Sequence, residues 1–163
     1  MAYMSPLQDT KFILENLLPP HIDLDNSTIE AVLSEAGKLA DNQLAPLNHF
    51  GDKNNPVLRQ DNEVQTPEGF SEAFSRIAEG GWIGISGDTK YGGLGLGYLE
   101  LCVIAEELGR SLAPTPFSSS VYLATESILQ FGSDSLKQNH LPSLASGEKI
   151  GAFAHSESTT APT

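Results

Sequence analysis

Residues 80–97 read Gly-Gly-Trp-Ile-Gly-Ile-Ser-Gly-Asp-Thr-Lys-Tyr-Gly-Gly-Leu-Gly-Leu-Gly and lead into an apolar segment over 98–110. A glycine cluster in front of a helix is typical of phosphate binding. A P-loop would need Lys and then Ser or Thr after the last glycine, where this chain has Tyr98 and Leu99. A dinucleotide fingerprint that began at Gly93 would need Gly or Ala at position 98. The stretch therefore predicts sharp backbone turns and the start of a helix, and not a phosphate loop.

Length and charge narrow the class of protein. The chain has 163 residues, the size of one domain, and a net charge of −12 from 21 acidic and 9 basic side chains. This charge argues against a nucleic-acid partner, although a local basic pocket for a small anion stays open. No apolar run approaches the roughly 20 residues of a membrane span, and the N-terminus does not resemble a secretory signal. We therefore expect no membrane span. The single Cys102 cannot form an internal disulfide, which fits a reducing compartment, so we expect a cytoplasmic protein.

Hydrophobic periodicity predicts a mainly α fold of about six helices with at most one strand at the C-terminal end. We expect these helices to form an orthogonal up-down bundle. Capping boxes at Ser5 and Ser27 begin the first two helices, and Pro19 and Pro20 stop the first. The expected helices cover residues 5–18, 27–44, 66–79, 98–110, 121–131 and 134–146. The polar segment 46–65 is interpreted as an ordered loop, and 149–155 as a possible strand.

Side-chain positions follow from the same pattern. In the helix over 98–110, Glu100 and Glu107 are seven residues apart and mark a solvent-facing stripe, with Glu106 beside it. Glu106 and Glu107 diverge by about 100° on a helix, so they do not form a paired carboxylate site. Cys102 is expected to be a packing residue. In the last two helices the residues expected to face inward are Val121, Ala124, Ile128, Leu129, Leu136, His140, Leu141 and Leu144.

Five motifs between Gly80 and Phe153 resemble the N-terminal helical domain of the acyl-CoA dehydrogenases, flavoenzymes that desaturate acyl thioesters. The matching pieces are Gly81–Trp82, Tyr91–Gly97, Glu106–Arg110, Phe131–Lys137 and Leu141–Glu148 leading to Ile150–Ala154. The start of the chain also resembles the N-terminal extension of longer bacterial members, whereas Leu112–Phe117 resembles short-form bacterial members, so both subfamilies stay open. The resemblance implies an extension helix and linker over 1–26, the family's N-terminal helical domain over 27–148, and the start of a middle β domain over 149–163.

The resemblance also implies an activity. It implies an FAD-dependent oxidoreductase of fatty acid metabolism that forms the α,β double bond of an acyl-CoA and passes electrons to an electron-transferring flavoprotein. In the family the catalytic base is a glutamate of a C-terminal helical bundle. No catalytic residue is therefore expected in these 163 residues, which by themselves are not expected to be active. We expect a homo- or hetero-oligomer without metal.

Two groups of residues are carried over from the family. Pro116, Ser119, Ser120 and Leu123 correspond to the helix that lines the inner end of the acyl pocket, and Phe153, His155 and Ser156 to the segment that contacts the flavin. The serines at 118–120 are equally good helix caps. A lone His such as His155 is more often an ordinary surface residue than a cofactor contact.

The sequence departs from the family pattern after Ser156. Ser158 stands where the family has Pro, and Ala161 and Pro162 stand where it has a Gly-Ser pair that helps to hold cofactor and thioester. A second hypothesis is therefore a flavin-free, non-catalytic subunit that pairs with an active partner and shapes its acyl pocket. A third is a domain that serves only in assembly.

Overall fold

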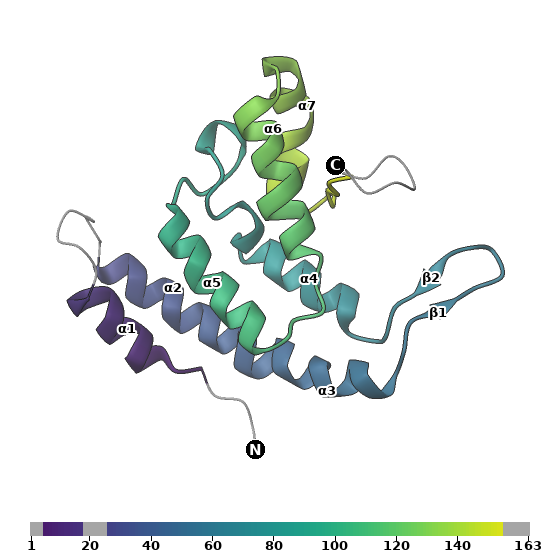
Figure 1. Cartoon of the computed structure of the whole chain (residues 1–163), viewed down its shortest axis with the longest axis horizontal. Coiled ribbons are helices and arrows are strands. Elements are labelled where there is room, and N and C mark those ends of the chain that lie inside the picture. Colours follow the sequence, from purple (N-terminus) through teal and green to yellow (C-terminus); the bar gives the residue numbers. More distant parts are fainter. Residues whose placement is uncertain (1–4, 18–25, 155–163) are drawn as a thin grey trace, which may run out of the picture. The chain divides into compact units, whose positions relative to one another are not determined.

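The computed structural model describes residues 5–17 and 26–154, which form helices and one short hairpin (Figure 1). The chain divides into two units. The first contains Met1–Ile77 and Leu96–Thr115, and the second contains Ala78–Gly95 and Pro116–Thr163. The expected mainly α class is confirmed.

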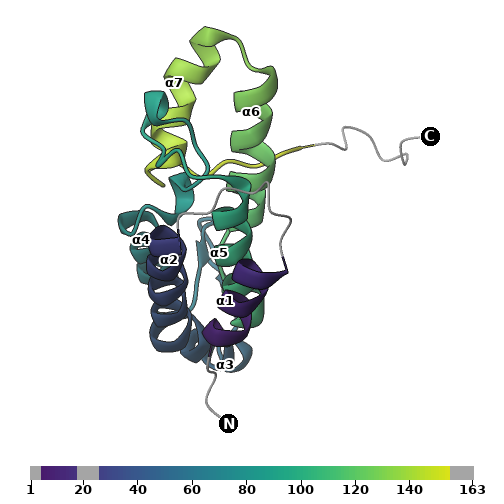
Figure 2. The same cartoon turned by 90° about the vertical axis from the view of Figure 1, so that its left-hand side faces the viewer.

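The first unit is built around a long helix. α2 (Asn26–Leu39) continues through a π-helical turn, η1 (Ala40–Leu44), into α3 (Ala45–Lys53). α1 (Leu7–Asn16) and α5 (Tyr98–Arg110) both contact α2, and α4 (Phe70–Glu79) belongs to this unit except for its last two residues (Figures 1 and 2). The buried apolar side chains of this unit are Leu14, Ile29, Val32, Leu33, Ala36, Leu39, Ala40, Leu44, Ala73, Ile77, Leu101, Val103, Ile104 and Leu108.

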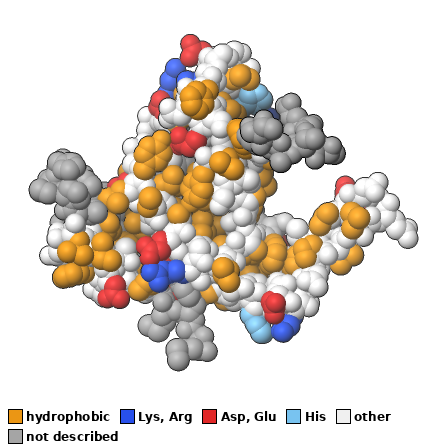
Figure 3. Space-filling model, viewed as in Figure 1, with side chains coloured by type: hydrophobic (Ala, Val, Ile, Leu, Met, Phe, Trp, Pro, Cys, Tyr) orange, Lys and Arg blue, Asp and Glu red, His pale blue; other side chains and the backbone are white. Residues whose placement is uncertain are grey.

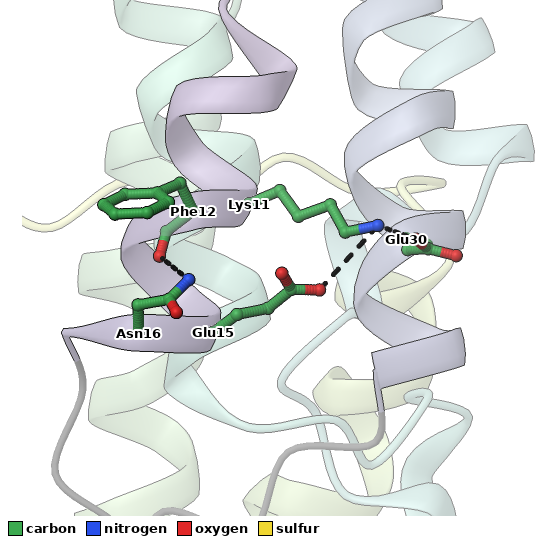
Figure 4. Close-up of polar contacts among 5 residues, drawn as sticks. All are labelled: Lys11, Phe12, Glu15, Asn16 and Glu30. Atoms are coloured by element: carbon green, nitrogen blue, oxygen red, sulfur yellow. Dashed lines mark hydrogen bonds and ion pairs between the residues drawn. The ribbon is translucent and has the colours of Figure 1, made fainter.

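α1 lies against α2, and an apolar contact and an ion pair can be named between them. A Cβ added at Gly37 of α2 would lie 2.9 Å from Cδ2 of Leu7, so the helices approach closely where Gly37 has no side chain. Further along, the Lys11 ammonium donates to Glu30 of α2 and lies 3.7 Å from Glu15 of its own helix (Figure 4).

The capping box expected at Ser5 does not form. α1 begins at Leu7 with no side-chain cap, and the backbone N–H of Ser5 donates to Oδ1 of Asp41 at 3.0 Å. Ser5 is therefore held by the turn after α2 and does not cap α1.

The loop expected over 46–65 is wrong in detail. Its first part is α3, in which Pro46 occupies the first turn, where the missing N–H costs no helix bond. None of the side chains of α3 is buried, so the segment has no apolar stripe by which the sequence pattern could have found the helix. The prediction of α4 was four residues too long at its start, since that helix begins at Phe70 and not at Thr66.

The rest of that segment is an antiparallel hairpin of β1 (Val57–Leu58) and β2 (Val64–Gln65), in which Val57 pairs with Gln65. The turn is closed by Arg59 N–H donating to the Glu63 carbonyl at 2.8 Å, with Asn62 at a positive φ of 66°. Its apolar side chains are exposed at the surface (Figure 3). Residues 149–154, where a strand was expected, are described without one.

α5 turns a different side to solvent from the one expected. Glu107 is buried, with 3% of its surface exposed, whereas Cys102 is exposed. The solvent face runs through Cys102, Glu106 and Arg110, and the last two form an ion pair. The predicted stripe through Glu100 and Glu107 is therefore wrong for Glu107, and Cys102 is not a packing residue.

The glycine stretch of the second unit closes on itself, and the predicted sharp turns are confirmed. Two short 3₁₀ turns, η2 (Trp82–Gly84) and η3 (Thr89–Tyr91), are joined by backbone hydrogen bonds from Leu94 to Gly84 and from Gly95 to Gly87, both 2.9 Å long. After this loop α5 begins at Tyr98, as predicted.

Helix α7 (Asp134–Ala145) begins where its cap predicted. Oγ of Ser133 accepts a hydrogen bond from the N–H of Leu136 at 3.3 Å. Only the second half of α7 carries buried side chains, Leu141, Leu144 and Ala145, so the expectation that Leu136 and His140 face inward is wrong. The helix contacts η2 and η3 of the glycine loop as well as the helix that precedes it.

Candidate functional site

Three of the four predicted acyl-pocket residues, Ser119, Ser120 and Leu123, lie on one continuous helix of the second unit, and Pro116 lies just before it. This helix begins as a π-helix, η4 (Ser118–Thr125), and continues as α6 (Glu126–Phe131). Long π-helical stretches are rare and are often found at functional sites, because the wider turn displaces side chains from their α-helical positions. The first unit has a π-helical turn as well, η1, so the π-helix alone does not single out this segment as a site.

The four residues differ in exposure. Leu123 is exposed, Pro116 and Ser119 are half-buried, and Ser120 is buried with 1% of its surface exposed. Leu123 and Ser119 are thus accessible to a ligand, whereas Ser120 faces the interior of the unit.

None of the serines at 118–120 caps the helix, because the residue before η4 is Phe117 and no side chain makes a cap bond there. The hydroxyl of Ser119 instead donates to the carbonyl of Pro116 at 3.0 Å. The ring of Phe117, which is buried, meets the ring of Tyr122 edge-on with centroids 5.4 Å apart. The start of the helix is therefore stabilised by an aromatic pair and not by a serine cap.

Ser120 joins this helix to the segment that follows α7. Its Oγ accepts a hydrogen bond from the N–H of Gly151 at 3.0 Å. Sequence analysis placed Gly151 within the motif Ile150–Ala154 but gave it no role of its own. A second hydroxyl of the helix, that of Thr125, is buried without a hydrogen-bond partner in the described part of the chain.

Of the residues predicted to contact flavin, Phe153 is described, and His155 and Ser156 lie outside the described residues, as do Ser158, Ala161 and Pro162. Phe153 follows α7 in a segment without regular structure, and half of its surface is exposed (51%). An accessible aromatic ring suits stacking against a flat, conjugated cofactor such as a flavin. At this position the residue present fits the group that the resemblance implies.

Lys90 is the basic residue of the glycine loop. Its ammonium lies 5.1 Å from the centroid of the Tyr91 ring, and interaction with the Tyr91 hydroxyl raises the pKa of Lys90 above its usual 10.5. Asp134 and Asp88 add smaller effects in the same direction. Lys90 is therefore charged at neutral pH.

A separate depression lies in the first unit. It has a volume of about 330 Å³ and is lined by Asn42, Gln43, Leu47, Gly69, Glu72, Ala73 and Arg76. It contains none of the predicted site residues. Among the described residues, no group of three or more His, Cys, Asp or Glu side chains is arranged to hold a metal ion. None of the described helices combines the length and the apolar character that crossing a membrane requires.

The helices, the glycine loop and the π-helix define a mainly helical domain. The family model for the acyl-CoA dehydrogenase N-terminal domain matches residues 26–148, which is most of the chain. The chain therefore belongs to the acyl-CoA dehydrogenase family.

Curated relatives agree with this assignment. The chain is 36% identical over 88 residues to mitochondrial isovaleryl-CoA dehydrogenase of Pongo abelii, covering 53% of this chain and 21% of that protein. It is 25% identical over 166 residues to 3-methylmercaptopropionyl-CoA dehydrogenase of Ruegeria pomeroyi, covering 94% of this chain and 27% of that protein. The chain thus spans about a fifth to a quarter of the length of these relatives.

Solved structures share the fold. An acyl-CoA dehydrogenase from Bacillus anthracis, complexed with FAD, superposes with a TM-score of 0.67 at 22% identity, covering 88% of this chain and 23% of that one. A chain from the electron transferring flavoprotein study of Acidaminococcus fermentans gives a TM-score of 0.60 at 25% identity, covering 79% of this chain and 31% of that one.

Proposed function

We propose that this chain is the N-terminal helical domain of an FAD-dependent acyl-CoA dehydrogenase that forms the α,β double bond of an acyl-CoA thioester. The family match over residues 26–148 is the observation that carries the proposal. In this function the chain contributes to the acyl pocket and to the enclosure of the flavin, and the catalytic base comes from another part of the enzyme.

The residues of the second unit have distinct parts in this proposal. Leu123 is exposed on η4 and supplies an apolar contact for the acyl chain, while the half-buried Ser119 and Pro116 form the neighbouring wall. Phe153 offers its exposed ring to the flavin, and His155 and Ser156 follow it in sequence. When bound, FAD would accept the hydride that leaves the β carbon of the substrate.

The proposal also covers the oligomeric state, the compartment and the electron acceptor. We expect an oligomer in the cytoplasm that passes electrons to an electron-transferring flavoprotein. The likeness to a chain from the Acidaminococcus fermentans flavoprotein study supports an electron-transfer setting.

A second candidate is a flavin-free subunit that pairs with an active dehydrogenase and shapes its acyl pocket. It is favoured by Ser158, Ala161 and Pro162, which replace the Pro and the Gly-Ser pair of the family pattern.

One experiment separates the two candidates. The protein is expressed from its complete gene, its visible spectrum is recorded, and a panel of acyl-CoAs is added without oxygen. A dehydrogenase is expected to be yellow and to bleach with at least one thioester. A protein that stays colourless after FAD is supplied would contradict the dehydrogenase and support the flavin-free subunit.

A further inference from the structure

Ser120 uses its hydroxyl group differently from the serine beside it. Serines in helices commonly bond to a carbonyl one turn earlier, as Ser119 does with Pro116 at 3.0 Å. Oγ of Ser120 instead accepts from the N–H of Gly151, 31 residues further along the chain, at 3.0 Å. Ser120 is almost fully buried, so water does not compete for this bond.

The backbone at Gly151 rests directly on the same helix. A Cβ added at Gly151 would lie 2.5 Å from Cβ of Ala124 and 3.3 Å from Cδ2 of Leu144. Ala124 is four residues from Ser120 on the helix, so the hydrogen bond and the close contact hold the same point of the chain. Gly151 is thus fixed both by a polar bond and by lack of space.

This fixed point lies two residues before Phe153, a separation of about 7 Å in an extended chain. On the other side of the bond, Ser119 and Leu123 are close to Ser120 on the helix. A displacement of Gly151 would therefore move the aromatic ring relative to the residues proposed to line the acyl pocket.

We infer that Ser120 is a positioning residue whose hydroxyl holds Phe153 in register with the acyl-pocket helix. The inference rests on the proposed function, in which Phe153 faces the flavin. Ser120 is almost fully buried, so in this inference it acts through the Gly151 backbone.

The test compares two variants of the protein expressed from its complete gene and loaded with FAD. Ser120→Ala removes the hydroxyl that accepts from Gly151. Ser111→Ala is the matched control, because Ser111 is equally buried but bonds to the carbonyl of Glu107 in its own helix, at 2.7 Å. Ser120→Cys keeps the size of the side chain but accepts a hydrogen bond only weakly.

We expect Ser120→Ala to raise the dissociation constant of FAD about threefold to tenfold, the range that the loss of one hydrogen bond produces. Ser120→Cys should fall between Ser120→Ala and the wild type, and Ser111→Ala should stay within about twofold of the wild type. Amide hydrogen exchange at Gly151, followed by mass spectrometry, should accelerate in Ser120→Ala and not in Ser111→Ala.

Two results would overturn the inference while the proposed function stands. One is faster exchange at Gly151 with unchanged FAD affinity, which would make the bond a purely structural one. The other is an equal loss of FAD affinity in Ser120→Ala and Ser111→Ala, which would indicate general destabilisation. A wild-type protein that binds no FAD would instead refute the proposed function, and the inference would fall with it.

Discussion

Gly93 approaches Gly87 so closely that a Cβ on Gly93 would lie 2.2 Å from the carbonyl carbon of Gly87. This contact brings together two parts of the glycine loop on either side of η3, and the hydrogen bond from Gly95 N–H to the Gly87 carbonyl lies beside it. The contact explains why the stretch is rich in glycine although it matches neither the P-loop nor the dinucleotide fingerprint. The backbone fills the space that side chains would need.

Replacing Gly93 should therefore destabilise the loop more than replacing its neighbour. Gly93→Ala forces backbone against backbone, and we expect a loss of about 3 kcal/mol in the free energy of unfolding. Gly92→Ala is the control, because Gly92 has a φ of 85° but nothing within 4 Å of an added Cβ. Its cost should be the conformational one alone, about 1–2 kcal/mol. Denaturant unfolding of both variants gives their free energies of unfolding. If Gly92→Ala proves less stable than Gly93→Ala, the prediction is wrong.

A similar comparison applies to Gly151. Gly151→Ala places a methyl group 2.5 Å from Ala124, and we expect a loss of about 2 kcal/mol in the free energy of unfolding. Gly109→Ala, in α5, meets nothing within 4 Å and should stabilise the protein by about 0.5 kcal/mol, since alanine favours a helix more than glycine does. Thermal unfolding of the two variants should shift in opposite directions. Equal shifts would mean that the segment after α7 is not packed as described.

The ion pair between Lys11 of α1 and Glu30 of α2 should weaken at high pH. The hydrogen bond from Lys11 to Glu30 raises the pKa of Lys11 above 10.5, and the charge of Glu15 adds to this effect. A raised pKa means that the stabilisation is fully present below the pKa of about 10.4 in the unfolded chain, and is lost as the pH rises through the folded value.

Lys11→Met removes the charge and keeps an apolar side chain. The difference in stability between wild type and Lys11→Met is expected to shrink as the pH rises above about 10.4, measured by denaturant unfolding at each pH. Lys38→Met is the control, since Lys38 pairs only with Glu35 of its own helix in the described residues, and both side chains are exposed. If the Lys11 variant and the control follow the same pH profile, the link between α1 and α2 does not depend on the Lys11 charge.

The exposure of Cys102 can be measured directly. The 163-residue chain should react with one equivalent of a thiol reagent under native conditions, at a rate within about tenfold of that of the unfolded chain, because Cys102 lies on the solvent face of α5. Cys102→Ser should not react at all, since the chain has one cysteine. Reaction only after denaturant is added would restore the packing role that the sequence predicted.

Much of the fold could be predicted from local patterns. The apolar repeat of α2, the start of α5 after Gly97 and the Ser133 cap of α7 each depend on residues within a few positions of one another. α3 and the hairpin could not be predicted in this way, because they bury no stripe of side chains. Their only local signals are Pro46 and the polar turn residues, which fit a loop equally well.

By itself, the sequence determined the helical class, the tight glycine turns and membership of the acyl-CoA dehydrogenase family. All of these depend on residue types at short, fixed spacings. Only the tertiary structure decided that Glu107 is buried and Cys102 exposed, since an apolar helix offers several stripes and its neighbours select which one faces water. Only the tertiary structure also shows that Ser120 bonds to Gly151. The two positions are 31 residues apart, and no local sequence pattern predicts a hydrogen bond over that separation.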